Sequence, residues 1–283
     1  MKKIKNLIFG LSATLIATGF SGCNLQSIKN NSNNNNKLTP KIEVELETET
    51  TSEEIINITT PTPTPPTLHN TITEEEEDNR KLVALTFDDG PGKYTEELLV
   101  LLKEYDIKVT FFVLGYNINK YPDALLQASL DGHEIAIHGD THTSFTKLTI
   151  DETTTEINNT INYIEALGID ASELVRPPYG NLNNKLKENI DYPFILWNID
   201  TEDWKTKDKD QIKQQILDNI DEGAIILMHD TTTAVHEADT DALKEILPEL
   251  TQEYKFVTIS ELCEHYDINL ENGKIYRKIK SEN

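Results

Sequence analysis

The chain has 283 residues, of which 49 are acidic and 26 are basic, so its net charge is -23. This length fits one large domain with additions or two small domains, and the acidity argues against nucleic acid and anionic membrane surfaces as partners. Only two cysteines are present, Cys23 and Cys263, which excludes a disulfide-stabilised scaffold and a zinc site built on thiolates.

The first 22 residues have the pattern of an export signal. Three lysines within the first five residues precede an uncharged run from Leu7 to Gly22, which ends in the sequence Phe-Ser-Gly-Cys at 20–23. That ending resembles a bacterial lipobox, in which the cysteine becomes lipidated and forms the mature N-terminus. We therefore predict a lipoprotein signal peptide at 1–22 and lipidation of Cys23, with an ordinary cleaved secretion signal or an uncleaved N-terminal anchor as alternatives. Each of these interpretations places the rest of the chain outside the cytoplasmic membrane, either lipid-anchored at the cell surface or secreted.

Residues 23–80 are predicted to form a low-complexity, disordered tether. They contain an asparagine-rich run at 30–36, a Pro-Thr segment at 61–66 and an acidic block at 74–78, and they contain no aromatic residue. Such a composition offers too little apolar surface to offset the entropy lost on ordering.

From Lys81 onward, short apolar runs alternate with amphipathic helical patterns. Seven strands are predicted, at 82–87, 109–114, 134–138, 174–176, 194–199, 224–228 and 256–259. Most are unbroken apolar stretches, as expected for strands that are buried on both faces. With six intervening helices they predict an α/β domain over 81–266, either an irregular parallel barrel or an open doubly wound sheet, followed by a C-terminal tail at 267–283.

Titratable residues follow five of the predicted strands. Parallel α/β folds bind their ligands at the carboxyl ends of the strands, so these residues are expected to converge on one rim. In chain order they are Asp88 and Asp89, His138 and His142, Arg176, Asp200 and Asp203, and His229. Their convergence predicts an enzyme.

Asp88, Asp89, His138 and His142 have the composition of a catalytic metal site. Two imidazoles and one carboxylate leave coordination positions open for water and substrate, and a divalent ion held there polarises a carbonyl. Adjacent aspartates project to opposite sides of an extended backbone, so one can bind the metal while the other serves as a general base. The alternative interpretation of the aspartates is a polar turn after a strand.

Five short motifs occur in one order over about residues 81–262. They are Thr86–Gly90 (TFDDG), His138–His142 (HGDTH), Arg176–Gly180 (RPPYG), Asp200–Trp204 (DTEDW) and Leu227–His229 (LMH). Together they resemble the motifs of carbohydrate esterase family 4, the polysaccharide deacetylases with a NodB homology domain. One position departs from that pattern, because Gly139 stands where the family has a Ser or Thr whose hydroxyl braces the metal-binding loop. The resemblance implies a distorted (β/α)7 barrel and a deacetylase catalytic domain at 81–266.

The resemblance also implies a role for each motif residue. The metal ligands would be Asp89, His138 and His142. The general base would be Asp88, with Arg176 as its partner, and the general acid would be His229, with Asp203 as its partner. Asp200 would be a further catalytic residue. The pocket would be formed by the backbone N–H of Tyr179, which would stabilise the oxyanion, and by Trp204 and Leu227, which would enclose the acetyl methyl. The alternatives are a surface ion pair for Arg176, core packing for Trp204 and Leu227, and a capped core position for His229.

The predicted function is metal-dependent hydrolysis of the N-acetyl group of a cell-wall polysaccharide, with N-acetylglucosamine in peptidoglycan as the preferred substrate. Zn²⁺ is the expected ion, with Co²⁺ or Mn²⁺ as alternatives. The motifs describe the acetyl group and not the sugar chain, so chitin or chito-oligosaccharide, N-acetylmuramic acid and acetylated xylan are alternative substrates. The alternative class is a non-catalytic glycan-binding lipoprotein, although the chain retains every motif residue that this chemistry needs. The only expected contact with a membrane is the lipid anchor, and a monomer is assumed.

Overall fold

The computed structural model describes residues 78–230 and 236–281. The predicted signal peptide, Cys23 and the predicted tether up to residue 77 lie outside the described residues. Among the residues that are described, no helix combines the length and apolarity that crossing a membrane requires.

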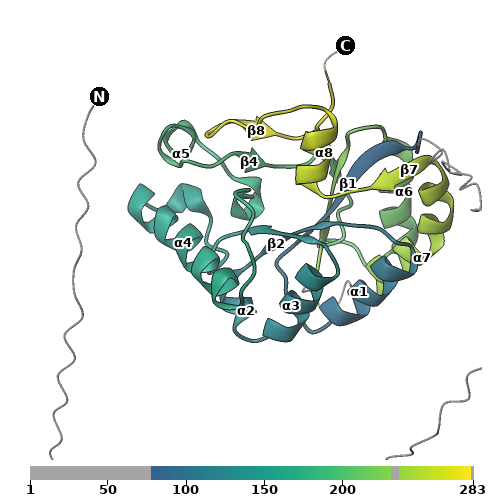
Figure 1. Cartoon of the computed structure of the whole chain (residues 1–283), viewed down its shortest axis with the longest axis horizontal. Coiled ribbons are helices and arrows are strands. Elements are labelled where there is room, and N and C mark those ends of the chain that lie inside the picture. The colour runs from purple at the N-terminus through teal and green to yellow at the C-terminus, as the bar shows by residue number, and fades with distance from the viewer. Residues whose placement is uncertain (1–77, 231–235, 282–283) are drawn as a thin grey trace, which may run out of the picture. The chain divides into compact units, whose positions relative to one another are not determined.

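A parallel sheet of six strands forms the centre of the described region (Figure 1). The strand order is β3-β2-β1-β6-β5, and β7 pairs with the first residues of β1. The strands are β1 (Lys81–Asp88), β2 (Thr110–Val113), β3 (Glu134–Ile137), β5 (Ile199–Asp200), β6 (Ile225–His229) and β7 (Tyr254–Phe256). Because all these pairings are parallel, the carboxyl ends of the strands lie at one rim.

The sheet closes on itself through Val175. This residue forms parallel bridges to Ile137 of β3 and to Phe194 of β4 (Phe194–Ile195), and the chain continues from β4 into β5, which pairs with β6. The backbone N–H of Arg176 donates to Ile137 O at 2.9 Å, and that of Ile195 donates to Val175 O at 3.0 Å. The ring of strands is therefore complete, and the predicted distorted (β/α)7 barrel is confirmed.

Three predicted strands differ in detail from the structure. Of 174–176 only Val175 pairs, although it pairs on both sides. The predicted strand 194–199 is divided in two, because β4 pairs with Val175 whereas β5 pairs with β6. The last strand ends at Phe256 and not at 259, because Thr258 caps the following helix in a capping box with Glu261.

Helices cover the outside of the barrel. In Figure 1, α1 to α4 lie along the lower and left side of the view, and α6 and α7 lie on the right. The α-helices are α1 (Thr95–Glu104), α2 (Gly115–Ile118), α3 (Pro122–Leu130), α4 (Ile150–Ala166), α5 (Asn184–Asn189), α6 (Lys209–Asn219), α7 (His236–Glu253) and α8 (Ile259–His265), and 3-10 turns occur at Phe145–Lys147 and Pro178–Gly180.

Alternation along β1 separates the two faces of the barrel wall. Val83, Leu85 and Phe87 belong to the large core between the sheet and the helices, whereas Ala84 packs with apolar residues of neighbouring strands in a second core. Asp88 has the same parity as Ala84, so it ends β1 on the inner side, at the rim where the motif residues gather.

The segment predicted as a C-terminal tail, 267–283, is packed against the domain as far as it is described. Strand β8 (Ile275–Tyr276) pairs in parallel with β4, and Ile279 is buried, with its N–H donating to Gly223 O at 2.9 Å. This segment therefore covers the side of the barrel next to β4.

Candidate metal centre and catalytic pocket

The motif residues surround a cavity of about 400 Å³ at the carboxyl ends of the strands. They come in groups from different strands, with Asp88 and Asp89 at the end of β1, His138 and His142 after β3, and Leu227 and His229 in β6. The lining residues are Asp88, Asp89, His138, His142, Tyr179, Trp197, Asp200, Trp204, Leu227 and His229. Two further predicted residues, Arg176 and Asp203, are completely buried and contact the lining residues from outside the cavity. Cys23 lies outside the described residues.

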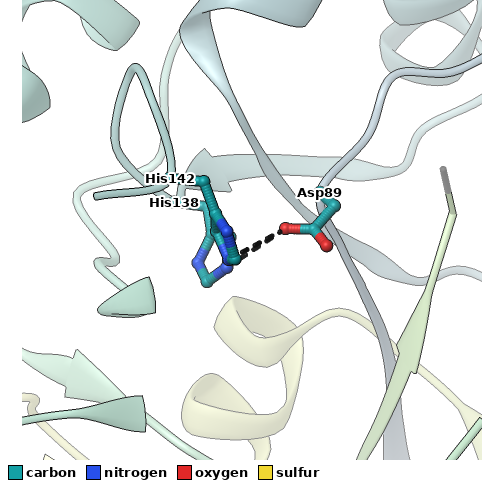
Figure 2. Close-up of side chains that lie close together, drawn as sticks. All are labelled: Asp89, His138 and His142. Atoms are coloured by element: carbon teal, nitrogen blue, oxygen red, sulfur yellow. Dashed lines mark ion pairs between the residues drawn. The ribbon is translucent and has the colours of Figure 1, made fainter. Parts of the chain in front are cut away.

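Asp89, His138 and His142 bring three potential metal ligands together (Figure 2). Their ligating atoms all lie within 4.8 Å of one another. Asp89 Oδ1 is 3.5 Å from His138 Nε2 and 3.3 Å from His142 Nε2, and it is a buried atom without a hydrogen-bond partner. A buried, unsatisfied carboxylate oxygen facing two imidazole nitrogens is the arrangement that a divalent cation satisfies, so these residues fit a metal ion.

The backbone fixes the tautomer of His138. Its Nδ1 lies 2.7 Å from the carbonyl oxygen of Arg176, which can only accept, so Nδ1 carries the hydrogen and Nε2 keeps its lone pair for a metal. Burial lowers the pKa of His138 to about 3, an effect that the charge of Asp89 only partly opposes. The neutral imidazole is the form that ligates a cation.

Two of the three potential ligands, and the tyrosine beside them, are held in left-handed backbone conformations. Asp89 has φ 72°, His142 has φ 60° and Tyr179 has φ 64°. The ring of Tyr179 lies 4.5 Å from that of His142, measured between centroids. The segment from His138 to His142 is a loop and not a helix, so its two imidazoles converge through this turn geometry.

Asp88 and Arg176 form a fully buried ion pair beside the metal ligands. Arg176 Nη1 donates to Asp88 Oδ1 at 2.7 Å and to Thr86 Oγ1 at 2.8 Å. Burial raises the pKa of Asp88, and the charge of Arg176 opposes that shift. The second carboxylate oxygen, Oδ2, lies 3.6 Å from His138 Nε2, so Asp88 presents one oxygen to the arginine and the other to the site.

His229 and Asp203 form the second pair. Asp203 Oδ1 lies 2.8 Å from His229 Nδ1, and Asp203 Oδ2 accepts from the backbone N–H of His229 at 2.6 Å. Burial alone lowers the pKa of His229, but the hydrogen bond and charge of Asp203, with Asp88 and Asp89, outweigh it and raise the pKa to about 9. The imidazolium is therefore favoured, and its Nε2 has no hydrogen-bond partner among the described residues, so the Nε2–H can face the cavity that His229 lines.

The pocket walls combine exposed aromatic rings with buried side chains. Tyr179 and Trp204 are 63% and 56% exposed, whereas Leu227 is buried. No hydrogen bond from the Tyr179 N–H occurs among the described residues, so this donor is available to a ligand. Asp200 lines the cavity, and its Oδ1 accepts from Glu202 N at 2.9 Å, which shapes the loop that leads to Asp203.

Trp197 lines the same cavity and was missed by the sequence reasoning. It follows the apolar run from Phe194, so its indole was included in a predicted strand. The available signal was a large aromatic residue at the same strand end as Asp200, between two charged motifs.

The chain resembles known polysaccharide deacetylases in sequence and in structure. The family model described as polysaccharide deacetylase matches residues 75–192. The chain is 38% identical to the peptidoglycan-N-acetylmuramic acid deacetylase PdaC of Bacillus subtilis, over 66% of this chain and 39% of that protein. It is 37% identical to a peptidoglycan-N-acetylglucosamine deacetylase of Bacillus cereus, over 65% of this chain and 69% of that protein.

Among solved structures, a family 4 acetyl xylan esterase from Clostridium thermocellum in complex with a cobalt ion matches with a TM-score of 0.66 and 28% identity. This match covers 70% of the present chain and 99% of the esterase. The similarity to PdaC, by contrast, covers well under half of that protein's length, so it concerns one domain of a longer relative.

Proposed function

Because the chain belongs to the polysaccharide deacetylase family, we propose that it hydrolyses the N-acetyl group of a sugar in peptidoglycan, with N-acetylglucosamine as the target. The observation that carries this proposal is one cavity that brings together a site for a metal ion and two ion pairs, one fully buried and one partly buried. Asp88 with Arg176 supplies a base, and His229 with Asp203 supplies an acid.

Asp89, His138 and His142 would hold the ion, for which we propose Zn²⁺. A divalent ion in this position polarises the acetamide carbonyl and lowers the pKa of water. Thiolate ligands are absent from the set, and two imidazoles with one carboxylate also suit Co²⁺ and Mn²⁺.

The protein residues divide the proton transfers of amide hydrolysis between them. Asp88 accepts a proton from the attacking water, and Arg176 holds the carboxylate in position through its other oxygen. The N–H of Tyr179 donates to the carbonyl oxygen as negative charge develops there. His229 donates its Nε2 proton to the departing amine, while Asp203 keeps the ring oriented and protonated.

The preference for N-acetylglucosamine rests on the Bacillus cereus relative, which is a peptidoglycan-N-acetylglucosamine deacetylase. The three aspartates that line the cavity face the imidazolium of His229 and the site for a divalent cation, which offset their charge. The exposed rings of Tyr179 and Trp204 offer apolar faces on which a sugar ring can pack.

The test is acetate release from purified peptidoglycan and from N-acetylglucosamine oligomers, with Zn²⁺ or Co²⁺ added. Mass spectrometry of the digested wall then locates each free amine on glucosamine or on muramic acid. We expect acetate release with the amine on glucosamine, and an amine on muramic acid would overturn the sugar assignment. An absence of acetate from every glycan, with metal shown to be bound, would leave the non-catalytic glycan-binding class.

We also propose that the protein acts outside the cytoplasmic membrane, anchored by a lipid on Cys23. The support is the charged start, the uncharged run and the position of Cys23 in the sequence. Metabolic labelling with a fatty acid tests this proposal. The full chain is expected to take up label and the Cys23→Ser variant is not, and equal labelling of both would contradict the anchor.

A further inference from the structure

The loop between the two metal histidines, Gly139–Thr141, is anchored from two sides. On one side, the start of α2 donates to its carbonyl groups, from Gly115 N to Gly139 O at 3.1 Å and from Tyr116 N to Asp140 O at 3.1 Å. On the other side, the N–H groups of the loop donate to one carboxylate, that of Glu156 in α4. This loop has no regular secondary structure, so these contacts set the separation of the two imidazoles.

Glu156 accepts three hydrogen bonds from the loop. Its Oε2 accepts from Asp140 N at 2.9 Å and from Thr141 N at 2.8 Å, and its Oε1 accepts from Thr141 Oγ1 at 2.8 Å. Hydrogen bonds to an ionised acceptor are stronger than those between neutral groups. Here two adjacent backbone N–H groups donate to the same carboxylate oxygen. The loop is thereby tied to a helix and not only to itself.

Helix α4 is built to present this carboxylate. A capping box between Thr149 and Glu152 fixes its first turn, and Ile157 lies on its buried face. Asn159, close to one turn beyond Glu156, donates from Nδ2 to Asp140 Oδ2 at 3.0 Å. The helix therefore contacts the loop at two points. Glu156 binds the backbone N–H groups of the loop, an arrangement that we call the Glu156 clamp, and Asn159 binds the side chain of Asp140.

The surroundings of Gly139 are consistent with α4, and not a side chain at position 139, holding the loop in place. A Cβ atom at residue 139 would lie 3.1 Å from Phe145 Cε1 and 3.3 Å from Glu156 Oε2, and Gly139 has φ +88°. A serine or threonine hydroxyl, the brace expected from the motif pattern, is absent here. The space beside the loop is occupied by the Phe145 ring and the Glu156 carboxylate.

We propose that Glu156 is a positioning residue for the metal centre, and that it fixes the loop in the conformation that aims His138 and His142 at one ion. It belongs neither to the residues that line the cavity nor to the three potential metal ligands. Its effect passes through the backbone of Asp140 and Thr141 to His142, whose positive φ needs an external constraint. The prediction concerns metal affinity, so its failure is distinguishable from failure of the proposed deacetylase activity.

The test is the dissociation constant of Zn²⁺ for the apoprotein, measured by competition with a chelator, together with the visible absorption of bound Co²⁺. Removing a hydrogen-bond partner of a metal ligand costs about 10- to 100-fold in affinity. Glu156 acts one step further away, through the loop backbone, so Glu156→Ala is expected to raise the Kd by about tenfold, the lower end of this range, and to alter the Co²⁺ spectrum. Glu156→Gln should restore binding to within about threefold of the original protein, because its amide oxygen can accept both N–H groups and its NH₂ can donate to Thr141 Oγ1.

Glu165→Ala is the matched control, since Glu165 is an exposed glutamate on the same helix. It should leave both the Kd and the Co²⁺ spectrum unchanged. A purely structural role for Glu156 would lower the melting temperature of the apoprotein without changing the Kd at a temperature well below melting.

A Zn²⁺ Kd for Glu156→Ala within twofold of the original value would overturn the proposal, and so would equal losses in Glu156→Ala and Glu156→Gln. If the alanine variant does not fold, Glu156→Asp takes its place. Its shorter side chain cannot reach the loop, so the same rise in Kd is expected and the same result refutes the proposal.

Discussion

Removing Arg176 is expected to destabilise the protein strongly, because this side chain fills the interior of the barrel and carries a charge there. It is completely buried and stacks on Phe112, with 3.9 Å between the guanidinium carbon and the ring centroid. Besides Asp88 and Thr86, it donates to the carbonyl oxygens of Ile195 at 3.1 Å and Leu196 at 3.3 Å.

Arg176→Met keeps much of the apolar volume and removes the charge. The variant leaves Asp88, which is 3% exposed, as a buried carboxylate without its counter-charge. Breaking a buried ion pair from one side costs about 3–5 kcal/mol in the free energy of unfolding, so we expect a loss in that range at pH 7. The loss should shrink as the pH falls towards 5, because the pKa of Asp88, already raised by burial, rises further without the arginine and the carboxyl takes up a proton.

Urea unfolding of the apoprotein measures this loss, and Asp88→Asn with the double variant completes a double-mutant cycle. If the pair is the cause, the double variant should be more stable than the sum of the single losses predicts, by about 2 kcal/mol, within the usual range for coupled contacts. A loss below about 1 kcal/mol for Arg176→Met would refute the reasoning. So would an additive cycle, because the arginine would then act only by filling space.

Three further predictions concern single carboxylates and imidazoles. Asp203→Asn should move the alkaline limb of the kcat/KM profile to lower pH. Asp203 raises the pKa of His229 to about 9, and a general acid loses its proton as pH rises through its pKa, so an unmoved limb would contradict this role. Asp88→Asn should abolish acetate release while Zn²⁺ still binds in a chelator competition, whereas His142→Ala should lose both acetate release and Zn²⁺ binding. Turnover by Asp88→Asn would overturn the assignment of Asp88 as the base. Asp239→Asn should raise the melting temperature more at pH 8 than at pH 5. Burial raises the pKa of this carboxyl, which has no hydrogen-bond partner among the described residues, so native stability falls as pH rises; a gain independent of pH would argue against this reasoning.

The rim of the barrel was predictable because each motif follows an apolar run. Asp88 follows the run at 82–87, and His229 follows the run at 224–228, so parallel strand ends alone bring these residues to one edge. The pairings within that rim were not predictable from this pattern. That Arg176 lies inside the barrel and contacts Asp88 depends on the packing of Phe112 and on the path of a single-residue bridge at Val175.

The packing of the C-terminal segment was also outside the reach of the sequence pattern. Strand β8 has two residues, too few to display a period, and its partner Phe194 lies about 80 residues earlier in the chain. The buried contact is made by Ile279, a single apolar residue between Lys278 and Lys280. Short non-local pairings of this kind are fixed by tertiary context and leave no local signal.

The conformations at the site explain why the spacing of His138 and His142 could indicate a metal without revealing its geometry. Six described residues other than glycine have positive φ, and four of them, Asp89, His142, Tyr179 and Glu202, lie in or beside the motifs. An L-residue in this region costs about 1–2 kcal/mol, and simple turn rules would assign such positions to Gly, Asn or Asp. In the proposed mechanism, both positions are occupied for their functional groups, the imidazole of His142 as a metal ligand and the backbone N–H of Tyr179 as a donor to the oxyanion. The sequence therefore departs from local preference at the metal site itself, and the surrounding contacts, among them the clamp of Glu156, hold it in place.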